Sequence, residues 1–402
     1  MPADRGPKRF VPTVPPAQRD ELPSSWLGRL LGAYRLYLQD ANRFLRSHPD
    51  VGRLDLLTLR ALDAAPPNRV LRAASALTAA SLDEIRAMSL AARYPHCSPD
   101  WFSTDPNQRR SPAAIGIDPA IDYGAVALCC PDCLRDDRGL ARVAHIRAGW
   151  TLSAETICPL HRCSLRRQCP GCGWLYMDYD FPHAAGVWRP CCDGCGLPCD
   201  AIAGDAVPTC SATAVEFLLS FEGSLGAALR GRPVDRRWIG SRCGPALLGL
   251  VSDLSRVLVQ TTSSSGKLAI EHFQAPQFPF LRSRSEEESE GADMHLPHLP
   301  VESRRAVFTA IAAMLRPDLA CQVWPDSHAF QNDPLHSLLE CLRLEDRSAL
   351  LAHAKAWPHA LRVRIAAKRT TPLPGQRKAT VNGRPATGER SHKQQHQGQL
   401  SV

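Results

Sequence analysis

The sequence has no uninterrupted apolar stretch approaching the about 20 residues that a membrane helix needs, so no membrane partner is expected. Its first ten residues carry charges and prolines but no apolar core, and therefore do not predict a secretory signal. A phosphate-binding loop, a dinucleotide fingerprint, an H-E-x-x-H motif and an internal repeat are all missing. These absences favour a cytoplasmic location, where cysteines bind metals or do chemistry more often than they form disulfides.

Aromatic residues are also scarce, at 6% of the 402 residues, whereas the 34 prolines predict many breaks between helices. Hydrophobic residues at 44% and charged residues at 22% are sufficient for a soluble globular protein. The chain is too long to fold around one small core, which favours two to three domains. We therefore expect a mainly α-helical chain built from several parts.

Lysine is the third scarcity, since it provides only six of the 48 basic residues. Arginine is the better bidentate phosphate ligand, but a G·C-rich coding sequence would give the same bias. The formal net charge of +8 is concentrated in the tail, where residues 368–402 hold seven basic side chains against one acid. Overall basicity therefore indicates a basic tail more than a folded nucleic-acid surface.

Cysteine is abundant, and twelve of the 16 cysteines lie between Cys129 and Cys210. Three C-x2-C pairs and one C-x2-H pair occur there. Two residues between ligands allow a tight turn to direct both donor atoms at one ion. Glycine follows Cys172 and Cys195, where a left-handed backbone is often needed.

Pairing the motifs in sequence order predicts two closed, four-ligand structural zinc sites without a vacant position for catalytic water. The first is a Cys3His site and the second is a zinc ribbon with C-x2-C-x19-C-x2-C spacing. The expected ligands are Cys130, Cys133, Cys158 and His161 for one Zn²⁺, and Cys169, Cys172, Cys192 and Cys195 for the other.

Alternatives to this assignment remain open from the sequence. The first and third pairs could share an ion, and the doublets Cys129–Cys130 and Cys191–Cys192 allow the register to shift by one. Cys163, Cys199 and Cys210 are interpreted as spare thiols, with Cys199 the best alternate ligand. Disulfides conflict with the expected compartment, and a redox dithiol would need a βαβ scaffold that is not indicated.

Helical periodicity surrounds this cysteine-rich region on both sides. A Ser24 or Ser25 N-cap should start a helix that carries apolar residues as far as Leu38. Further helices are expected over 54–62, 70–77, 82–90, 141–152, 212–229, 245–260, 301–315, 334–344, 346–356 and 358–368. Ser81 with Glu84 predicts a capping box. The helices over 70–77 and 82–90 fit either a helix-turn-helix or a plain bundle, because their turn lacks the usual glycine.

These patterns give a domain plan. We expect an irregular lead (1–22), an N-terminal helical domain (23–128), a double zinc-finger module (129–210), a C-terminal helical region (211–368) with a linker at 261–300, and a disordered basic tail (369–402). The last helix carries Arg362, Arg364, Lys368 and Arg369, which would form either a phosphate-binding face or a solvated one.

Several segments together resemble the TniQ family of transposition proteins, which is related to the TnsD target-selection proteins. The resemblance spans roughly residues 10–200 and departs from the family pattern at the cysteine doublets and at Ala79. It is carried by Glu21–Leu30, Leu77–Ser81 leading to Met88–Leu90, Cys130–Leu134, Trp150 ahead of Cys158–His161, Leu165, and Cys169–Gly173.

The resemblance implies a non-enzymatic role in target-site selection. Such a protein would bind DNA or a target-recognition complex and an AAA+ transposition ATPase, which recruits a separate transposase. It would be nucleoid-associated, and a homodimer is compatible with it.

Two other functions remain open from the residues alone. A zinc-ribbon transcription regulator would use the same two sites. A zinc-dependent nuclease would need carboxylates clustered near the fingers, for which Asp132, Asp136, Asp137, Asp178 and Asp180 are available.

Overall fold

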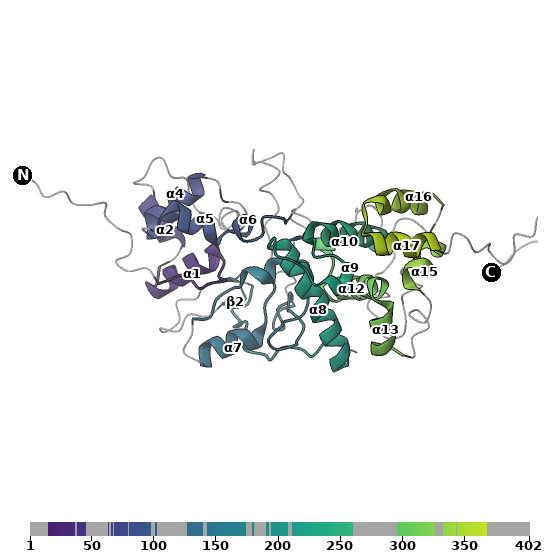
Figure 1. Ribbon diagram of the computed structural model, residues 1–402. Coiled ribbons are helices and arrows are strands. Elements are labelled where there is room, and N and C mark those ends of the chain that lie inside the picture. The colour runs from purple at the N-terminus through teal and green to yellow at the C-terminus, as the bar shows by residue number, and fades with distance from the viewer. Residues whose placement is uncertain are drawn as a thin grey trace, which may run out of the picture.

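The computed structural model describes residues 15–36, 38–45, 63, 66, 68–78, 80–97, 101–102, 127–139, 143–173, 179–180, 190–192, 194–207, 211–259, 296–325, 333–342 and 344–367. Helix dominates this part of the chain, as expected. The expected helix over 54–62 and the basic tail lie outside the described residues. Figure 1 shows the N-terminal helices at one end, the cysteine-rich region below the centre and the C-terminal helices at the other end.

The N-terminal helices form a small core of their own. Trp26, Leu27 and Leu30 pack with residues such as Leu71 and Ile85. The helices are α1 (Pro23–Ala33), α2 (Leu38–Leu45), α4 (Asn68–Thr78), α5 (Leu82–Met88) and α6 (Leu90–Arg93). The pair α4 and α5 agrees with both interpretations given above, since residue 79 in their turn lies outside the described part.

Two expectations at the start of this core are wrong. Helix α1 begins at Pro23 with Leu22 as N-cap and has no side-chain cap from Ser24 or Ser25. The Asp63 carboxylate, 39 residues away, instead accepts a hydrogen bond from the Ser24 amide at 2.8 Å. The helix also stops before Leu38, because Arg35 has a φ of 54° and turns the chain into α2. By contrast, the capping box of Ser81 and Glu84 is confirmed at the start of α5.

The described residues of the cysteine-rich region contain little regular structure. Helix α7 (Pro131–Gly139) follows Cys130 directly, and a 3₁₀ turn, η3, covers Ala148–Thr151. Strands β1 (Tyr179–Asp180) and β2 (Cys191–Cys192) pair antiparallel. The expected helix over 141–152 is wrong except for η3, because residues 143–146 have no regular structure and Arg147 forms an antiparallel bridge with Glu21 in the N-terminal lead.

The C-terminal half is helical. It contains α8 (Ala212–Leu229), α9 (Arg236–Ile239), α10 (Gly244–Val259), η6 (Leu296–His298), α12 (Val301–Leu315), α13 (Pro317–Val323), α15 (Pro334–Cys341), α16 (Leu344–His353), η7 (Ala354–Ala356) and α17 (His359–Ala367). Its longer helices agree with the expected positions, whereas α9, η6 and α13 were not expected. The expected linker over 261–300 is wrong at its end, because η6 begins at Leu296, and Leu296 and Leu299 are buried in the core.

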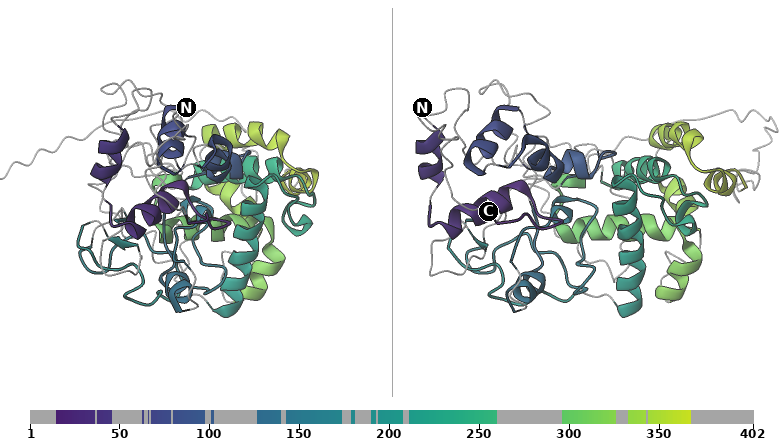
Figure 2. Two further views of the ribbon diagram at one scale, coloured as in Figure 1. Left: turned by 90° about the vertical axis from the view of Figure 1, so that its left-hand side faces the viewer. Right: turned by 60° about the vertical axis from the view of Figure 1, so that its left-hand side comes forward.

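The two views of Figure 2 show α12 lying across α8. An edge-on aromatic contact joins them, with the rings of Phe221 and Phe308 6.2 Å apart, and another joins α8 to α9, with the rings of Phe221 and Trp238 4.9 Å apart.

A second, larger core runs without interruption from the cysteine-rich region into these C-terminal helices, and includes Cys130, Trp150, Phe221 and Phe308. Helix α8 is long and apolar enough to cross a membrane by length and composition alone, which the sequence reading did not anticipate. Since 61% of its 18-residue window is buried inside the protein, it also meets the description of a core helix, and the membrane signal is weak.

The expected basic face of α17 is wrong at Arg364. Its guanidinium donates hydrogen bonds to the Asp333 carboxylate at 2.6 and 3.1 Å and to the Met314 carbonyl at 2.8 Å. Arg362 is exposed, while Lys368 and Arg369 lie outside the described residues.

Candidate metal centres

The structure brings the eight expected ligands together in two groups of four. Within each group, the ligand atoms all lie within 4.8 Å of one another. The groups follow the sequence order of the pairs, and Cys130 and Cys192, rather than Cys129 and Cys191, contribute to them. The groups are Cys130, Cys133, Cys158 and His161, and Cys169, Cys172, Cys192 and Cys195.

The spacing of these atoms suits a tetrahedral ion. With metal–sulfur bonds of about 2.3 Å, two sulfurs on a tetrahedron lie about 3.8 Å apart, and a sulfur and a nitrogen about 3.6 Å apart. In the first group, Cys133 Sγ lies 3.6 Å from Cys158 Sγ, and His161 Nδ1 lies 3.3–3.7 Å from the three sulfurs. In the second group, Cys169 Sγ lies 3.6 Å from Cys195 Sγ, and Cys172 Sγ lies 3.7 Å from Cys192 Sγ. Both donor sets therefore fit a metal such as Zn²⁺.

Three of the four ligand pairs share one backbone turn. The amide of the residue after the second ligand donates a hydrogen bond to the carbonyl of the first, with N–O distances of 2.8, 2.9 and 2.8 Å for Cys158, Cys169 and Cys192. The donating residues are Arg162, Gly173 and Gly196, whose φ values are 55°, 72° and 72°. The glycines confirm the expected left-handed positions. Arg162 adopts the same conformation without glycine, and the sequence did not reveal it.

The fourth pair is built on a helix instead of this turn. Pro131 is the first residue of α7, so that Cys133 lies in its first turn and its amide points at Cys130 Sγ, 3.4 Å away. Hydrogen bonds to Cys133 and to Cys163 lower the pKa of the Cys130 thiol. The helix N-terminus further favours thiolate, the form that binds metal.

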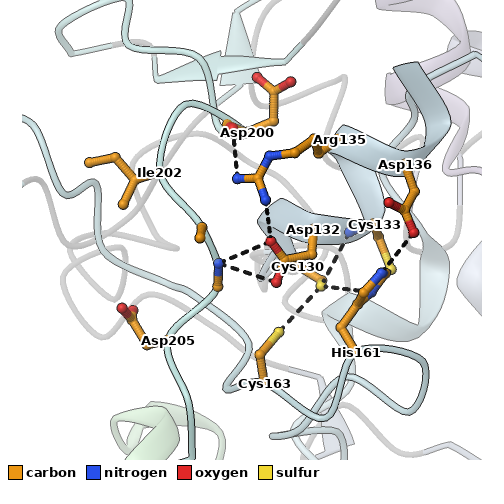
Figure 3. Close-up of polar contacts among 12 residues, drawn as sticks. Cys130, Asp132, Cys133, Arg135, Asp136, His161, Cys163, Asp200, Ile202 and Asp205 are labelled. Atoms are coloured by element: carbon orange, nitrogen blue, oxygen red, sulfur yellow. Dashed lines mark hydrogen bonds and ion pairs between the residues drawn. The ribbon is translucent and has the colours of Figure 1, made fainter. Parts of the chain in front are cut away.

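His161 is oriented by a carboxylate outside the group. Its Nε2 lies 2.8 Å from Asp136, which leaves Nδ1 facing the three sulfurs of the group. Figure 3 shows the ring of His161 between Asp136 and the Cys130 sulfur. Although burial lowers the pKa of His161, its hydrogen bonds to Cys158 and Asp136 raise that pKa to about 9. A carboxylate behind a histidine ligand fixes the ring orientation in metal sites.

In the second group, Cys172 and Cys195 are exposed whereas Cys169 and Cys192 are buried. Burial raises the pKa of Cys169, but the amides of Cys172 and Gly171 outweigh it and lower that pKa to about 7. The exposed pair indicates that this group stands at the protein surface.

Cys163 is the spare thiol closest to a metal group. Its sulfur lies 3.4 Å from that of Cys130, and together with Asp132 these residues form a third cluster of donors (Figure 3). Cys199 was expected to be the best alternate ligand, but the structure gives it Cys129 as its thiol partner, which raises the pKa of Cys199. Cys210 lies outside the described residues.

Three of the carboxylates considered for a nuclease have partners in the structure: Asp136 contacts His161, as described above, and Asp132 and Asp137 bind arginines. Asp132 accepts hydrogen bonds from Arg135 at 2.6 Å and from the Gly204 amide at 3.2 Å. Asp137 accepts two from Arg147 at 2.9 and 3.0 Å. Asp178 and the side chain of Asp180 lie outside the described part of the chain.

A family model described as TniQ matches residues 12–165. This N-terminal part of the chain is similar to the TniQ family. The match contains the first donor group and ends before the second. No curated protein matches the chain. TniQ proteins are associated with transposition machinery and DNA, and are generally non-catalytic accessory proteins.

The TniQ signature at Glu21–Leu30 joins the N-terminal core to the metal region. Glu21 is fully buried and binds the equally enclosed Arg29 through two contacts of 2.6 and 2.7 Å. The Ser25 hydroxyl donates to Glu21 and accepts from the Ile146 amide, each at 3.0 Å. The Leu22 amide donates to the Ile146 carbonyl at 3.0 Å. The polar residues of the signature therefore hold α1 against the strand-like segment that precedes η3.

Proposed function

We propose that this protein is a non-enzymatic accessory factor that selects target sites, linking target DNA or a target-recognition complex to an AAA+ transposition ATPase. The observation that carries the proposal is the TniQ match over residues 12–165, with four closely grouped metal donors inside it. A connecting role agrees with donor groups in which all four tetrahedral positions would be occupied by protein atoms.

Each donor group would hold one structural Zn²⁺. A zinc ion in such a site contributes roughly 10–16 kcal/mol of apparent binding free energy, which becomes folding free energy. The region from Cys129 to Cys199 contains few regular elements, so metal binding would hold its loops together. The ion would give shape to the region rather than activate water.

Two measurements test the proposal. Elemental analysis of the purified, reduced protein should give close to two zinc ions per chain. Immobilised protein should retain the ATPase encoded by the same element, and should protect the element's natural target DNA in footprinting. Nuclease-treated protein that retains neither partner would refute the connecting role, and metal-dependent DNA cleavage that survives Cys130→Ser would favour a nuclease.

A further inference from the structure

A groove of about 700 Å³ lies where the N-terminal lead, the first donor group and the end of α8 meet. Five arginines line it against two acids, Asp20 and Glu155. Cys133 and Cys158 also contribute to its wall, so the groove borders the first metal group. The arginines are Arg19, Arg93, Arg147, Arg230 and Arg232.

Both acids of the groove already have cationic partners. Asp20 lies 2.7 Å from His145 Nε2 and 3.5 Å from Arg147. Glu155 lies 3.3 Å from Arg230. Arg147 and Arg230 are therefore paired with carboxylates, and Arg147 also binds Asp137.

The other three arginines have no carboxylate within ion-pair distance in the described part of the chain. Arg93 is half-buried and donates to a neutral acceptor, the Glu21 carbonyl, at 2.9 Å. Burial lowers the pKa of Arg93, which indicates how far its charge is removed from water. The side chains of Arg19 and Arg232 are exposed at the rim and have no hydrogen-bonding partner among the described residues. The groove thus offers three cations to an anionic partner.

The two rim arginines stand on backbone that is held in place. After α8, the amide of Gly231 donates to the Ala228 carbonyl at 3.0 Å and that of Arg232 to the Ala227 carbonyl at 2.8 Å. With a φ of 70° at Gly231, this is a Schellman motif, which fixes the direction of the chain.

The lead that carries Arg19 is fixed from both sides. Trp26 Nε1 donates to the Pro15 carbonyl at 2.8 Å, and the Ala148 amide donates to the Asp20 carbonyl at 2.7 Å. The backbone that carries both rim cations is therefore fixed before any partner binds, which reduces the entropy lost on binding.

We infer that this groove binds the phosphate ridge of one DNA strand, an inference that rests on the proposed role at target DNA. Guanidinium groups match phosphate oxygens in a two-pronged geometry, and the regular phosphates of a strand can meet several separated arginines together.

An acidic peptide fits the groove less well. The two aromatic side chains in the wall, Tyr94 and Trp150, are buried and stack under arginines, with Arg230 5.3 Å and Arg147 4.9 Å from the ring centroids. These rings therefore offer little apolar surface for peptide side chains. The contact should be with the DNA backbone and independent of base sequence.

The test compares the full-length protein with the double variant Arg19→Gln/Arg232→Gln. Binding of fluorescein-labelled 30-base-pair duplexes of two unrelated sequences is followed by anisotropy from 50 to 200 mM salt. Each lost phosphate contact reduces the salt slope by about 0.9, so two lost contacts make the change in affinity over this range about 12-fold smaller than in wild type. The matched control is Arg236→Gln/Arg256→Gln, which removes two exposed arginines from α9 and α10.

Weaker binding with the reduced slope for both duplexes, and a control that resembles wild type, would support the inference. Unchanged binding by the groove variant, or an equal loss in the control, would overturn it and leave the proposed function standing. Wild-type protein that binds neither duplex nor the natural target would contradict direct DNA binding itself. A variant that retains DNA but loses the ATPase in pull-down would assign the groove to a protein partner instead.

Discussion

Removal of one partner from the buried Glu21–Arg29 pair should release the signature segment from the metal region. In Glu21→Met, the Arg29 guanidinium stays 3% exposed but loses both carboxylate contacts. An uncompensated buried charge costs about 3–5 kcal/mol. The Gln18 amide and the Ser25 hydroxyl, each 3.0 Å from the Glu21 carboxylate, would lose their acceptor as well. Glu21→Met and Arg29→Met should therefore each destabilise α1 by about this amount.

The double variant Glu21→Met/Arg29→Met should cost less than either single change, because no charge is then left buried. Hydrogen exchange of peptides that cover α1 measures the effect locally, and 3–5 kcal/mol corresponds to a loss of protection of about 10²–10⁴-fold. The control is Asp83→Asn, because the Asp83–Arg86 pair has the same 2.6 Å separation but exposed side chains. It should cost less than about 1 kcal/mol. Additive single changes, or a Glu21 effect as small as that of Asp83, would refute the reasoning.

Three further predictions concern the metal region and α8. Cys172→Ala should reduce the zinc content from two ions per chain to one. Cys243 is exposed and lies outside both donor groups, so Cys243→Ala should keep both ions. Equal zinc content in the two variants would contradict the second site. Burial raises the pKa of Glu222 to about 7, so unfolding free energy should fall by up to about 1.4 kcal/mol per unit as pH rises from about 4.5 to 7. Glu222→Gln should flatten that dependence in urea titrations, and an unchanged slope would argue against the shift. Gly231→Ala should lower the free energy of unfolding by about 1–2 kcal/mol, because residue 231 has a left-handed φ. Gly223→Ala should raise it by about 0.5–1 kcal/mol, because residue 223 lies in helix α8 with no atom near the added methyl group. Thermal unfolding that gives the reverse order would exclude this explanation.

Features that depend on nearby residues could be predicted from the sequence. The bounds of α8 and α12 agree with periodicity, and the Ser81–Glu84 box needs only four consecutive residues. The metal donors also group as expected, because two-residue spacers confine each pair to one turn and the pairs follow each other closely.

Features that depend on distant residues could not be predicted. The Asp63 carboxylate, which accepts a hydrogen bond from the Ser24 amide at the start of α1, lies 39 residues away in the sequence. The Arg364 guanidinium is held by Asp333, the N-cap residue of α15, 31 residues away in the sequence. The position of Cys163 beside Cys130 results from folding across 33 residues, although its place two residues after His161 was a signal that it would lie near the first group. Residues 143–146 are not helical, and the bridge between Arg147 and Glu21 in the lead is a distant contact that overrides local helical propensity.

The larger core has a consequence for dissecting this protein. The Thr156 amide, inside the TniQ match, donates to Glu222 on α8 at 3.0 Å, and Arg305 on α12 contacts the Thr156 carbonyl at 3.4 Å. A fragment that ends with the match would lack α8 and α12, and would uncover to solvent the apolar residues that share a core with them, such as Trp150 and Ile157. Such a truncation should aggregate on expression, so the matched segment is not a portable unit, and chimaeras that exchange it need their junctions placed beyond α12.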